Sequence, residues 1–181
     1  SGHNNLNQTA SSKPGPIQIH PFIKIGLDTS MRKTEILSIR REHINLQQLV
    51  IYIPKAKAGA REQPITADLG EYLAAYVATL RPGEKWLFPS PAAKDGRTVS
   101  LDKPFRRCVL TAGLDVKQVV RHTLRHTAIT HLVQAGVDLP TVKRISGHKN
   151  LSMVERYSHQ NGAHIQTAMD KLSDRYKAKA S

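Results

Sequence analysis

Residues 122–159 read HTLRHTAITHLVQAGVDLPTVKRISGHKNLSMVERYSH, and this stretch decides the fold class. Apolar side chains recur at helical spacing over residues 123–134, and Gly136 follows where a helix would end. Asp138 is placed to cap the next helix, and Gly147 is placed to end it. The pattern therefore predicts a series of short helices with defined ends.

A third helix should follow and carry a tyrosine. Ser152, with Glu155 three residues later, predicts a capping box for a helix that contains Tyr157. After Gly162 comes a narrow apolar stripe, followed by a basic tail; the stripe consists of Ile165, Met169 and Leu172. We therefore expect the chain to end in a helix.

The polar residues of this stretch fit the chemistry of cutting a phosphodiester. That reaction needs a nucleophile, stabilisation of negative charge on the phosphoryl oxygens, and a proton for the departing oxygen. His122 and Arg125 share one helical face, and a guanidinium can donate to two phosphate oxygens. His148 ends the next helix, and Tyr157 comes nine residues later (157 − 148). Neighbouring cations activate a phenol, whose ordinary pKa is about 10, because they favour the phenolate.

The residues before this stretch predict a further helix and a β-hairpin. Residues 28–39 predict a helix capped by its first polar side chains, which places Arg32 in the first turn. Residues 49–65 contain two short strand-forming runs around a basic, glycine-containing turn. We therefore expect a hairpin that presents Lys55 and Lys57.

Two more helices and an apolar plug complete the expected core. Thr66 should cap a helix whose apolar positions recur at helical spacing as far as Leu80. Residues 86–88 should fill the core below it, and residues 100–113 should form a helix that buries Cys108. The sum is a mostly α-helical domain with a small antiparallel β-sheet, an α+β fold.

Composition indicates an intracellular protein that binds a polyanion. The 181 residues include 27 Lys and Arg against 14 Asp and Glu, which gives a formal net charge of +13 and a pI near 10.1. Nucleic acid is the polyanion that such a charge favours. The single cysteine rules out an intramolecular disulfide framework, and no apolar run is long enough to span a membrane, so we expect a cytoplasmic location. Residues 1–15 are polar and aperiodic, which predicts a disordered leader or a tag remnant.

Four segments together resemble the tyrosine recombinase family of phage integrases and Xer-type resolvases. HTLRHT at 122–127, ISGH at 145–148 and RYSH at 156–159 look like the second and third boxes of the family, in order. TSMRKTEIL at 29–37 resembles its first box, with Ser30 where a glycine is common. The resemblance implies the catalytic-domain fold of these enzymes.

The resemblance also implies a role for each matching residue. Arg32 and Arg125 would hold the scissile phosphate while Tyr157 attacks it, leaving a 3′-phosphotyrosine and a free 5′ hydroxyl. His122 and His148 would assist proton transfer and hydrogen-bond the phosphate. No metal and no cofactor would be needed, since the arginines neutralise the charge that Mg²⁺ handles in other enzymes.

Other residues receive supporting roles from the same likeness. Glu35 would orient the surroundings of the first box. Lys57 matches the hairpin lysine that protonates the leaving oxygen, and Lys55 competes with it for that role. Further contacts with double-stranded DNA are expected from basic side chains, namely Lys55, Arg121, Lys143 and Lys149.

Full-length members of the family carry a core-binding domain before the catalytic one. We expect residues 16–181 to be the catalytic domain, with the core-binding domain absent. The full-length protein would assemble on DNA, as a tetramer, and would belong to a mobile genetic element or a chromosome resolution system. The stripe after Gly162 would pack either on its own chain or on a neighbouring copy.

Two other functions remain open at this stage. A type IB topoisomerase-like enzyme would use the same chemistry to nick and close DNA, and an assay with paired sites would separate the two. A non-catalytic helix-turn-helix protein would bind DNA through its charge, but a reading helix needs polar side chains directed at base edges. His122 and His126 have the spacing of a helical zinc pair, yet no HExxH motif and no companion cysteine accompany them.

Overall fold

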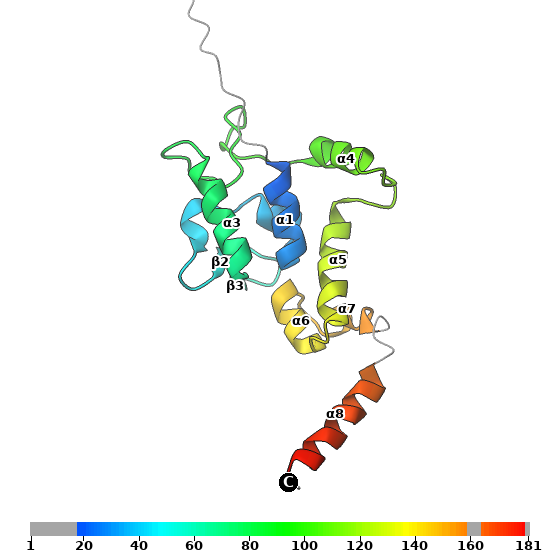
Figure 1. The fold of residues 1–181 in the computed structure, drawn as a ribbon. Coiled ribbons are helices and arrows are strands. Elements are labelled where there is room, and N and C mark those ends of the chain that lie inside the picture. Colours follow the sequence, from blue (N-terminus) through cyan, green and yellow to red (C-terminus); the bar gives the residue numbers. More distant parts are fainter. Residues whose placement is uncertain (1–17, 159–163, 180–181) are drawn as a thin grey trace, which may run out of the picture.

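The computed structural model describes residues 18–158 and 164–179, and its fold is mostly helical with a small antiparallel sheet, as expected (Figure 1). The sheet of this part has the strand order β1-β2-β3, with β1 at Ile44–Asn45, β2 at Val50–Ile53 and β3 at Arg61–Pro64. The helices are α1 Ile19–Thr29, α2 Lys33–Ile36, the 3-10 helix η1 Arg41–His43, α3 Ala67–Ala78, α4 Asp102–Thr111, α5 Arg121–Gln134, α6 Leu139–Ser146, α7 Ser152–Glu155 and α8 His164–Lys179. The expected leader, residues 1–15, lies outside the described residues.

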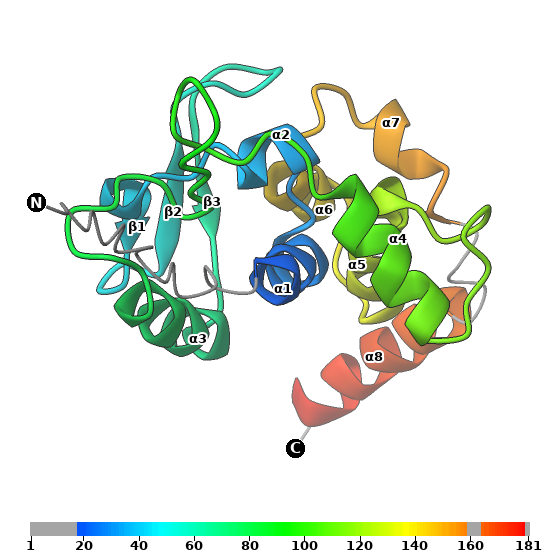
Figure 2. The same cartoon turned by 90° about the horizontal axis from the view of Figure 1, so that it is seen from above.

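Helix α1 lies between α3 and the sheet on one side and α5 on the other, as Figure 1 and Figure 2 both show. Its side chains Phe22 and Ile25 are buried in the main core. Gly26 faces α5 so closely that a Cβ built there would lie 3.1 Å from a methyl carbon of Leu124. The small residue therefore lets α5, which carries two of the expected catalytic residues, pack directly on α1.

A helix after residues 28–30 is present as α2, but the prediction that those residues cap it and that it runs from Met31 to Ile39 is wrong. Helix α1 runs through Thr29 and ends at Ser30, which has a left-handed backbone (φ 56°). A new, short helix then starts after Arg32, whose backbone N–H donates to the Glu35 carboxylate at 2.9 Å. Arg32 is therefore the N-cap residue of α2 and does not lie inside a helical turn. The break between α1 and α2 separates it from the end of α1.

The predicted hairpin is confirmed. Strands β2 and β3 are antiparallel, with Ile53 opposite Arg61, and the basic turn lies between these two residues. Ile51 and Ile53 are buried, whereas Tyr52 between them is exposed, as expected for a strand with one face on the core. The hairpin therefore carries its two lysines, Lys55 and Lys57, on the exposed side of the core.

The expected core of the first half is largely confirmed. Thr66 caps α3 by accepting a hydrogen bond from the Leu69 backbone N–H at 3.1 Å. Leu87 and Phe88 are fully buried, but Trp86 is only half-buried. Helix α4 buries Phe105 and Val109, as predicted, but Cys108, which was expected to be buried with them, is only half-buried.

The last third forms a second, smaller core cluster. Asp138 caps α6 by accepting from Thr141 at 2.9 Å, and Gly147 ends that helix with a left-handed backbone, as predicted. The apolar side chains between α5, α6 and α7 pack on one another and include Ile129, Val133, Val142, Val154 and Tyr157. The buried ring of Tyr157 is thus part of this cluster.

The capping box expected around Ser152 is wrong. Ser152 is the first residue of α7, and its side chain caps nothing; the residue before the helix, Leu151, makes no side-chain cap either. Helix α7 ends at Glu155, so Tyr157 lies in the turn after it, where its backbone N–H donates to the Val154 carbonyl at 3.0 Å. Tyr157 is therefore held by its ring and its turn rather than by a long helix.

Helix α8 extends away from the other helices (Figure 1). Its apolar residues Met169, Leu172 and Tyr176 are exposed, so the described part of the chain does not cover them. Within the described ranges, every helix is too short or too polar to cross a membrane.

Candidate active site

Three of the expected catalytic residues line one cleft between α2 and α5. The cleft holds about 270 Å³, and its floor and walls come from the break after α1 and from the first turns of α5. Its lining residues are Met31, Arg32, Lys33, Thr34, Arg121, His122 and Arg125. The structure therefore brings Arg32, His122 and Arg125 together although the two arginines lie far apart in the chain.

The Arg32 side chain is fixed from two sides. Its guanidinium donates to the Glu35 carboxylate at 3.2 Å and to the Gly147 carbonyl at 3.4 and 3.5 Å. The first contact lies within the α2 cap, and the second reaches the end of α6. Arg32 thus joins the first box to the residue directly before His148.

Arg125 is half-buried beside Arg32 and His148. It donates to the Ser30 carbonyl and approaches the imidazole of His148, with 3.2 Å between Nη2 and Nε2. Burial, and next the neighbouring charge of Arg32, lower the pKa of Arg125 to about 10. The guanidinium remains charged at neutral pH, and the mutual repulsion of the two arginines favours an anion between them.

His148 is held as a neutral ring. Burial, followed by the charge of Arg125, lowers its pKa from 6.5 to about 4. The Ser146 hydroxyl donates to the Val142 carbonyl at 2.7 Å, so its oxygen accepts from His148 Nδ1 at 2.6 Å. This hydrogen-bond pattern assigns the ring proton to Nδ1 and leaves Nε2 as the acceptor towards Arg125.

Glu35 is the one carboxylate among these cations, and its side chain is only 3% exposed. It accepts from Arg32 and, at 3.3 Å, from Arg61 of β3. Arg61 also donates to the Ile145 carbonyl at 3.3 Å and to the Gln63 side chain at 2.6 Å. Glu35 and Arg61 therefore tie the hairpin and the end of α6 to the α2 cap.

Arg61 was not among the site residues expected from the sequence. Its side chain is 14% exposed, and burial is the main cause that lowers its pKa, followed by an opposing contribution from Glu35. From the sequence, Arg61 was placed at the end of the basic turn, whereas in the structure it is the first residue of β3, opposite Ile53. Its side chain contacts the carbonyl of Ile145 at the end of α6, 84 residues later in the chain. A contact at that separation cannot be read from the neighbouring residues.

Gly147 sits against the same arginine. A Cβ built on it would lie 2.7 Å from Arg61 Nε and 3.0 Å from Cζ, and its φ of 65° is left-handed. Only a residue without a side chain fits this approach without displacing the guanidinium. The glycine that ends α6 thus also makes room for the ion pair of Arg61 with Glu35.

Tyr157 is only 6% exposed and packs in the smaller core cluster beside α5. Its hydroxyl is hydrogen-bonded to His126 Nδ1 and accepts from Arg156 at 3.2 Å, and the Arg156 guanidinium also lies 5.1 Å from the ring centre. The phenol is close enough to raise the pKa of Arg125. His122 and His148 were expected to assist proton transfer. In the described part of the chain, neither is hydrogen-bonded to this hydroxyl.

His126 was not expected at the site either; its spacing from His122 suggested only a zinc pair. Among the described residues, no three His, Cys, Asp or Glu side chains gather as a metal ion would need. The available signal was its spacing: one turn after His122 and three residues before buried Ile129, it shares their face of α5. Its contact with Tyr157 could not be read from that spacing.

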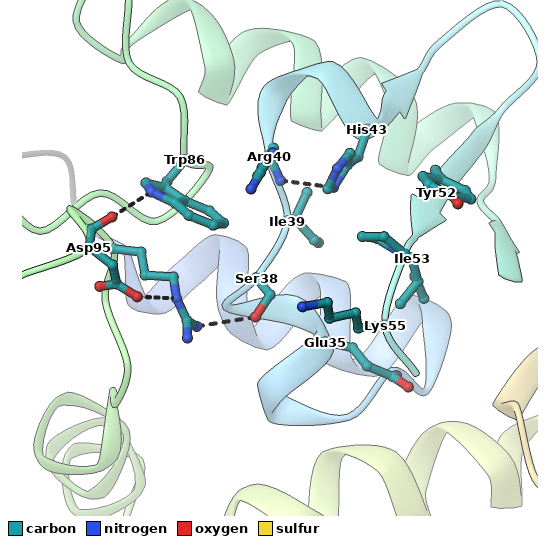
Figure 3. A pocket seen from close by; sticks show the side chains of 12 residues that line it. Glu35, Ser38, Ile39, Arg40, His43, Tyr52, Ile53, Lys55, Trp86 and Asp95 are labelled. Carbon is teal, nitrogen blue, oxygen red and sulfur yellow. Dashed lines mark hydrogen bonds and ion pairs between the residues drawn. The ribbon is translucent and has the colours of Figure 1, made fainter. Parts of the chain in front are cut away.

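Neither hairpin lysine lines the cleft of the two arginines. Lys57 is exposed in the turn between β2 and β3. Lys55 lines a separate cleft of about 460 Å³, in which Figure 3 shows it beside Glu35 and across from Trp86 and Asp95. The choice of Lys57 or Lys55 as proton donor stays a prediction.

The other expected DNA contacts lie at or near the site. Arg121 lines the cleft and forms an ion pair with Asp102. Lys143 is half-buried on α6, and Lys149, directly after His148, is exposed.

Comparison with known proteins shows the family to which the chain belongs. The sequence profile described as the phage integrase family matches residues 2–164, which is most of the chain. The chain belongs to this family. The match begins inside the segment expected to be a leader, and the structure describes the chain from residue 18.

Individual relatives agree with this assignment. The tyrosine recombinase XerD of Vibrio vulnificus (strain YJ016) is 29% identical over 160 residues, which cover 85% of this chain and 52% of that protein. Among solved structures, the Tn1549 transposon integrase in complex with transposon right end DNA has a TM-score of 0.72 at 20% identity, over 86% of this chain and 59% of that one. XerH bound to its palindromic difH substrate has a TM-score of 0.67 at 26% identity, over 84% and 45%. The chain spans about half the length of the curated relatives it matches.

We predict that Gly147→Ala destabilises the protein more than a left-handed glycine alone explains. The left-handed backbone should cost about 1 kcal/mol, and the clash with Arg61 about 1–3 kcal/mol more. Urea unfolding measures both, with Gly113→Ala as the matched control, because its φ is 70° and nothing lies within 4 Å of the added methyl. Equal losses for the two variants would contradict the clash.

We predict that His148 makes the folded protein less stable in acid. Its folded pKa of about 4 lies below its ordinary 6.5, so between these values the unfolded chain binds more protons and stability falls as the pH falls. Urea unfolding from pH 7 to pH 4 should therefore show a weaker pH dependence for His148→Asn. The same change at exposed His131 on α5 controls for the substitution. An unchanged pH dependence in His148→Asn would show that other groups cause it.

Proposed function

We propose that this chain is the catalytic part of a site-specific DNA recombinase that works through a 3′-phosphotyrosine. The observation that carries the proposal is the meeting of two guanidiniums, 93 residues apart in sequence (125 − 32), in a single cleft beside a tyrosine hydroxyl. A pair of fixed arginines is suited to hold one phosphate by paired hydrogen bonds. A helix-turn-helix protein that only binds DNA has no need of this convergence.

In the proposed reaction, the Tyr157 oxygen attacks the scissile phosphorus and the bond from phosphorus to the 5′ oxygen breaks. Arg32 and Arg125 stabilise the charge on the remaining phosphoryl oxygens, and Glu35 keeps Arg32 in place. His122, which lines the cleft, donates a hydrogen bond to the phosphate. His148 can donate to it only from Nε2, so it does so once the negative charge of the bound phosphate draws a proton to that nitrogen. The reverse attack by a 5′ hydroxyl rejoins the strand and releases the tyrosine.

The partner in this proposal is double-stranded DNA. The net charge of +13 favours it, and solved structures of relatives, the Tn1549 integrase and XerH, are complexes with transposon right end DNA and with the difH substrate. Lys57 or Lys55 donates the proton to the leaving oxygen once DNA is in place. Recombination between two sites requires several copies on DNA, which we propose for the full-length protein in the cytoplasm. Assays with one and with two DNA sites distinguish recombination from topoisomerase-like nicking and closing.

We predict that Tyr157→Phe abolishes covalent capture of DNA while leaving DNA affinity nearly unchanged. A duplex nicked beside the cleavage site loses its short 5′ fragment after attack, so the wild-type adduct accumulates and appears as a slower band in a denaturing gel. The linked residue is identified by mass spectrometry.

Two controls accompany this assay. EDTA should leave the adduct yield unchanged, because the arginines supply the positive charge, whereas inhibition by EDTA would call for a metal. An adduct that survives in Tyr157→Phe would place the nucleophile elsewhere.

We also predict that Lys149 contacts a DNA phosphate. Binding constants for a duplex, measured at several salt concentrations, should give a log–log slope that is smaller by roughly 1 for Lys149→Ala than for the wild type. Lys117→Ala, an exposed lysine in the loop before α5, should keep the wild-type slope. A loss of slope in both variants would mean that general charge, rather than a phosphate contact, governs the effect.

A further inference from the structure

The hydroxyl of Tyr157 has two side-chain partners, and they differ in chemistry. Arg156 can only donate, so at 3.2 Å its guanidinium donates to the phenol oxygen. The phenol therefore has its own proton left for the other partner, His126 Nδ1. The hydrogen bond from Tyr157 to His126 thus points the phenolic proton at a ring nitrogen that accepts it.

The surroundings of His126 keep its ring in the accepting form. Burial is the main cause that lowers its pKa, and the charges facing it from α5 and from the turn after α7 add to this effect: Arg156, then His122 and Arg125. A neutral ring that accepts at Nδ1 carries its proton at Nε2. Because the residue is exposed, the ring can exchange a proton with solvent.

The other histidines of the site are occupied differently. His148 is bonded to Ser146 through Nδ1 and faces Arg125 through Nε2. His122 lies one turn before His126 and lines the cleft of the two arginines. Of the three, only His126 is hydrogen-bonded to the phenol.

We propose that His126 is the catalytic base that takes the phenolic proton of Tyr157 as its oxygen attacks the phosphate. The inference rests on the function proposed above and assigns one step of it. The O–H bond of the phenol breaks, its proton binds Nδ1, the bond from oxygen to phosphorus forms, and the bond to the 5′ oxygen breaks. A separate donor, Lys57 or Lys55, protonates the 5′ oxygen.

Rejoining reverses each of these events. The imidazolium of His126 returns its proton to the departing phenol oxygen, so a full cycle of cleavage and ligation consumes no proton. Arg156 stabilises the phenolate by its hydrogen bond and by its charge above the ring. A histidine that only packs beside the ring would leave proton transfer to water.

The test separates two events of the chemical step: the attack of the tyrosine oxygen and the departure of the 5′ oxygen. Two nicked duplexes are compared in single-turnover cleavage, one with the natural 5′ oxygen at the scissile phosphate and one with sulfur in that place. Sulfur leaves without a proton, so a variant that lacks the proton donor recovers on the sulfur substrate, whereas a variant that lacks the base does not.

We expect His126→Ala to slow cleavage of both substrates by the same factor, about 10²–10⁴-fold, with little change in DNA affinity. Added imidazole should restore part of the rate, and the defect should shrink as the pH approaches about 10, where a phenol ionises without help. Lys57→Ala or Lys55→Ala should recover on the sulfur substrate. His131→Ala, an exposed histidine on the same helix, should behave as the wild type.

Three results would overturn the inference. One is recovery of His126→Ala on the sulfur substrate, which would move His126 to the leaving group. Another is a wild-type rate in His126→Ala. A third is a defect that neither imidazole nor high pH reduces, which would leave only a packing role; thermal unfolding confirms that the variant is folded. If the wild type forms no adduct through Tyr157, the proposed function fails first and the inference fails with it.

Discussion

The buried carboxylate of Glu35 is the contact on which the site depends. A charge that is almost entirely removed from water is costly unless it is fully paired, and here two guanidiniums and a backbone N–H pair it. Those partners come from the α2 cap and from the hairpin, and Arg32 and Arg61 each reach on to a carbonyl at the end of α6. A single anion thereby fixes three segments that are remote in sequence, and the glycine at the end of α6 provides the space.

The same arrangement explains the electrostatics of the cleft. Arg32, Arg61 and Arg125 are crowded around one carboxylate, so the group carries excess positive charge that the protein itself does not neutralise. Burial strengthens the repulsion, because there is little water between the groups to screen it. A bound phosphate would relieve this repulsion and find its hydrogen-bond donors already oriented, which is how a rigid site lowers the cost of stabilising charge during a reaction.

Local signals in the sequence were enough for part of this picture. The hairpin, the Thr66 and Asp138 caps and the glycine end of α6 all follow from the properties of a few adjacent residues, and each was predicted. The break at Ser30 was not, because a serine with a left-handed backbone has no local sequence pattern. The contacts of Arg61 with α6 and of His126 with Tyr157 are made across the fold. The family resemblance pointed to Arg32, Arg125 and Tyr157 as site residues. It did not indicate which histidine is hydrogen-bonded to the phenol.

The place of Tyr157 in the smaller apolar cluster has a thermal consequence. A reactive group on a flexible loop moves freely at any temperature, whereas here the aromatic ring contributes to the packing of α5, α6 and α7. Any swing of the hydroxyl towards a phosphate must either carry that cluster with it or expose the ring to water. Amino-acid changes among Ile129, Val133 and Val142 should therefore shift the temperature range of the proposed cleavage, although they alter no polar group.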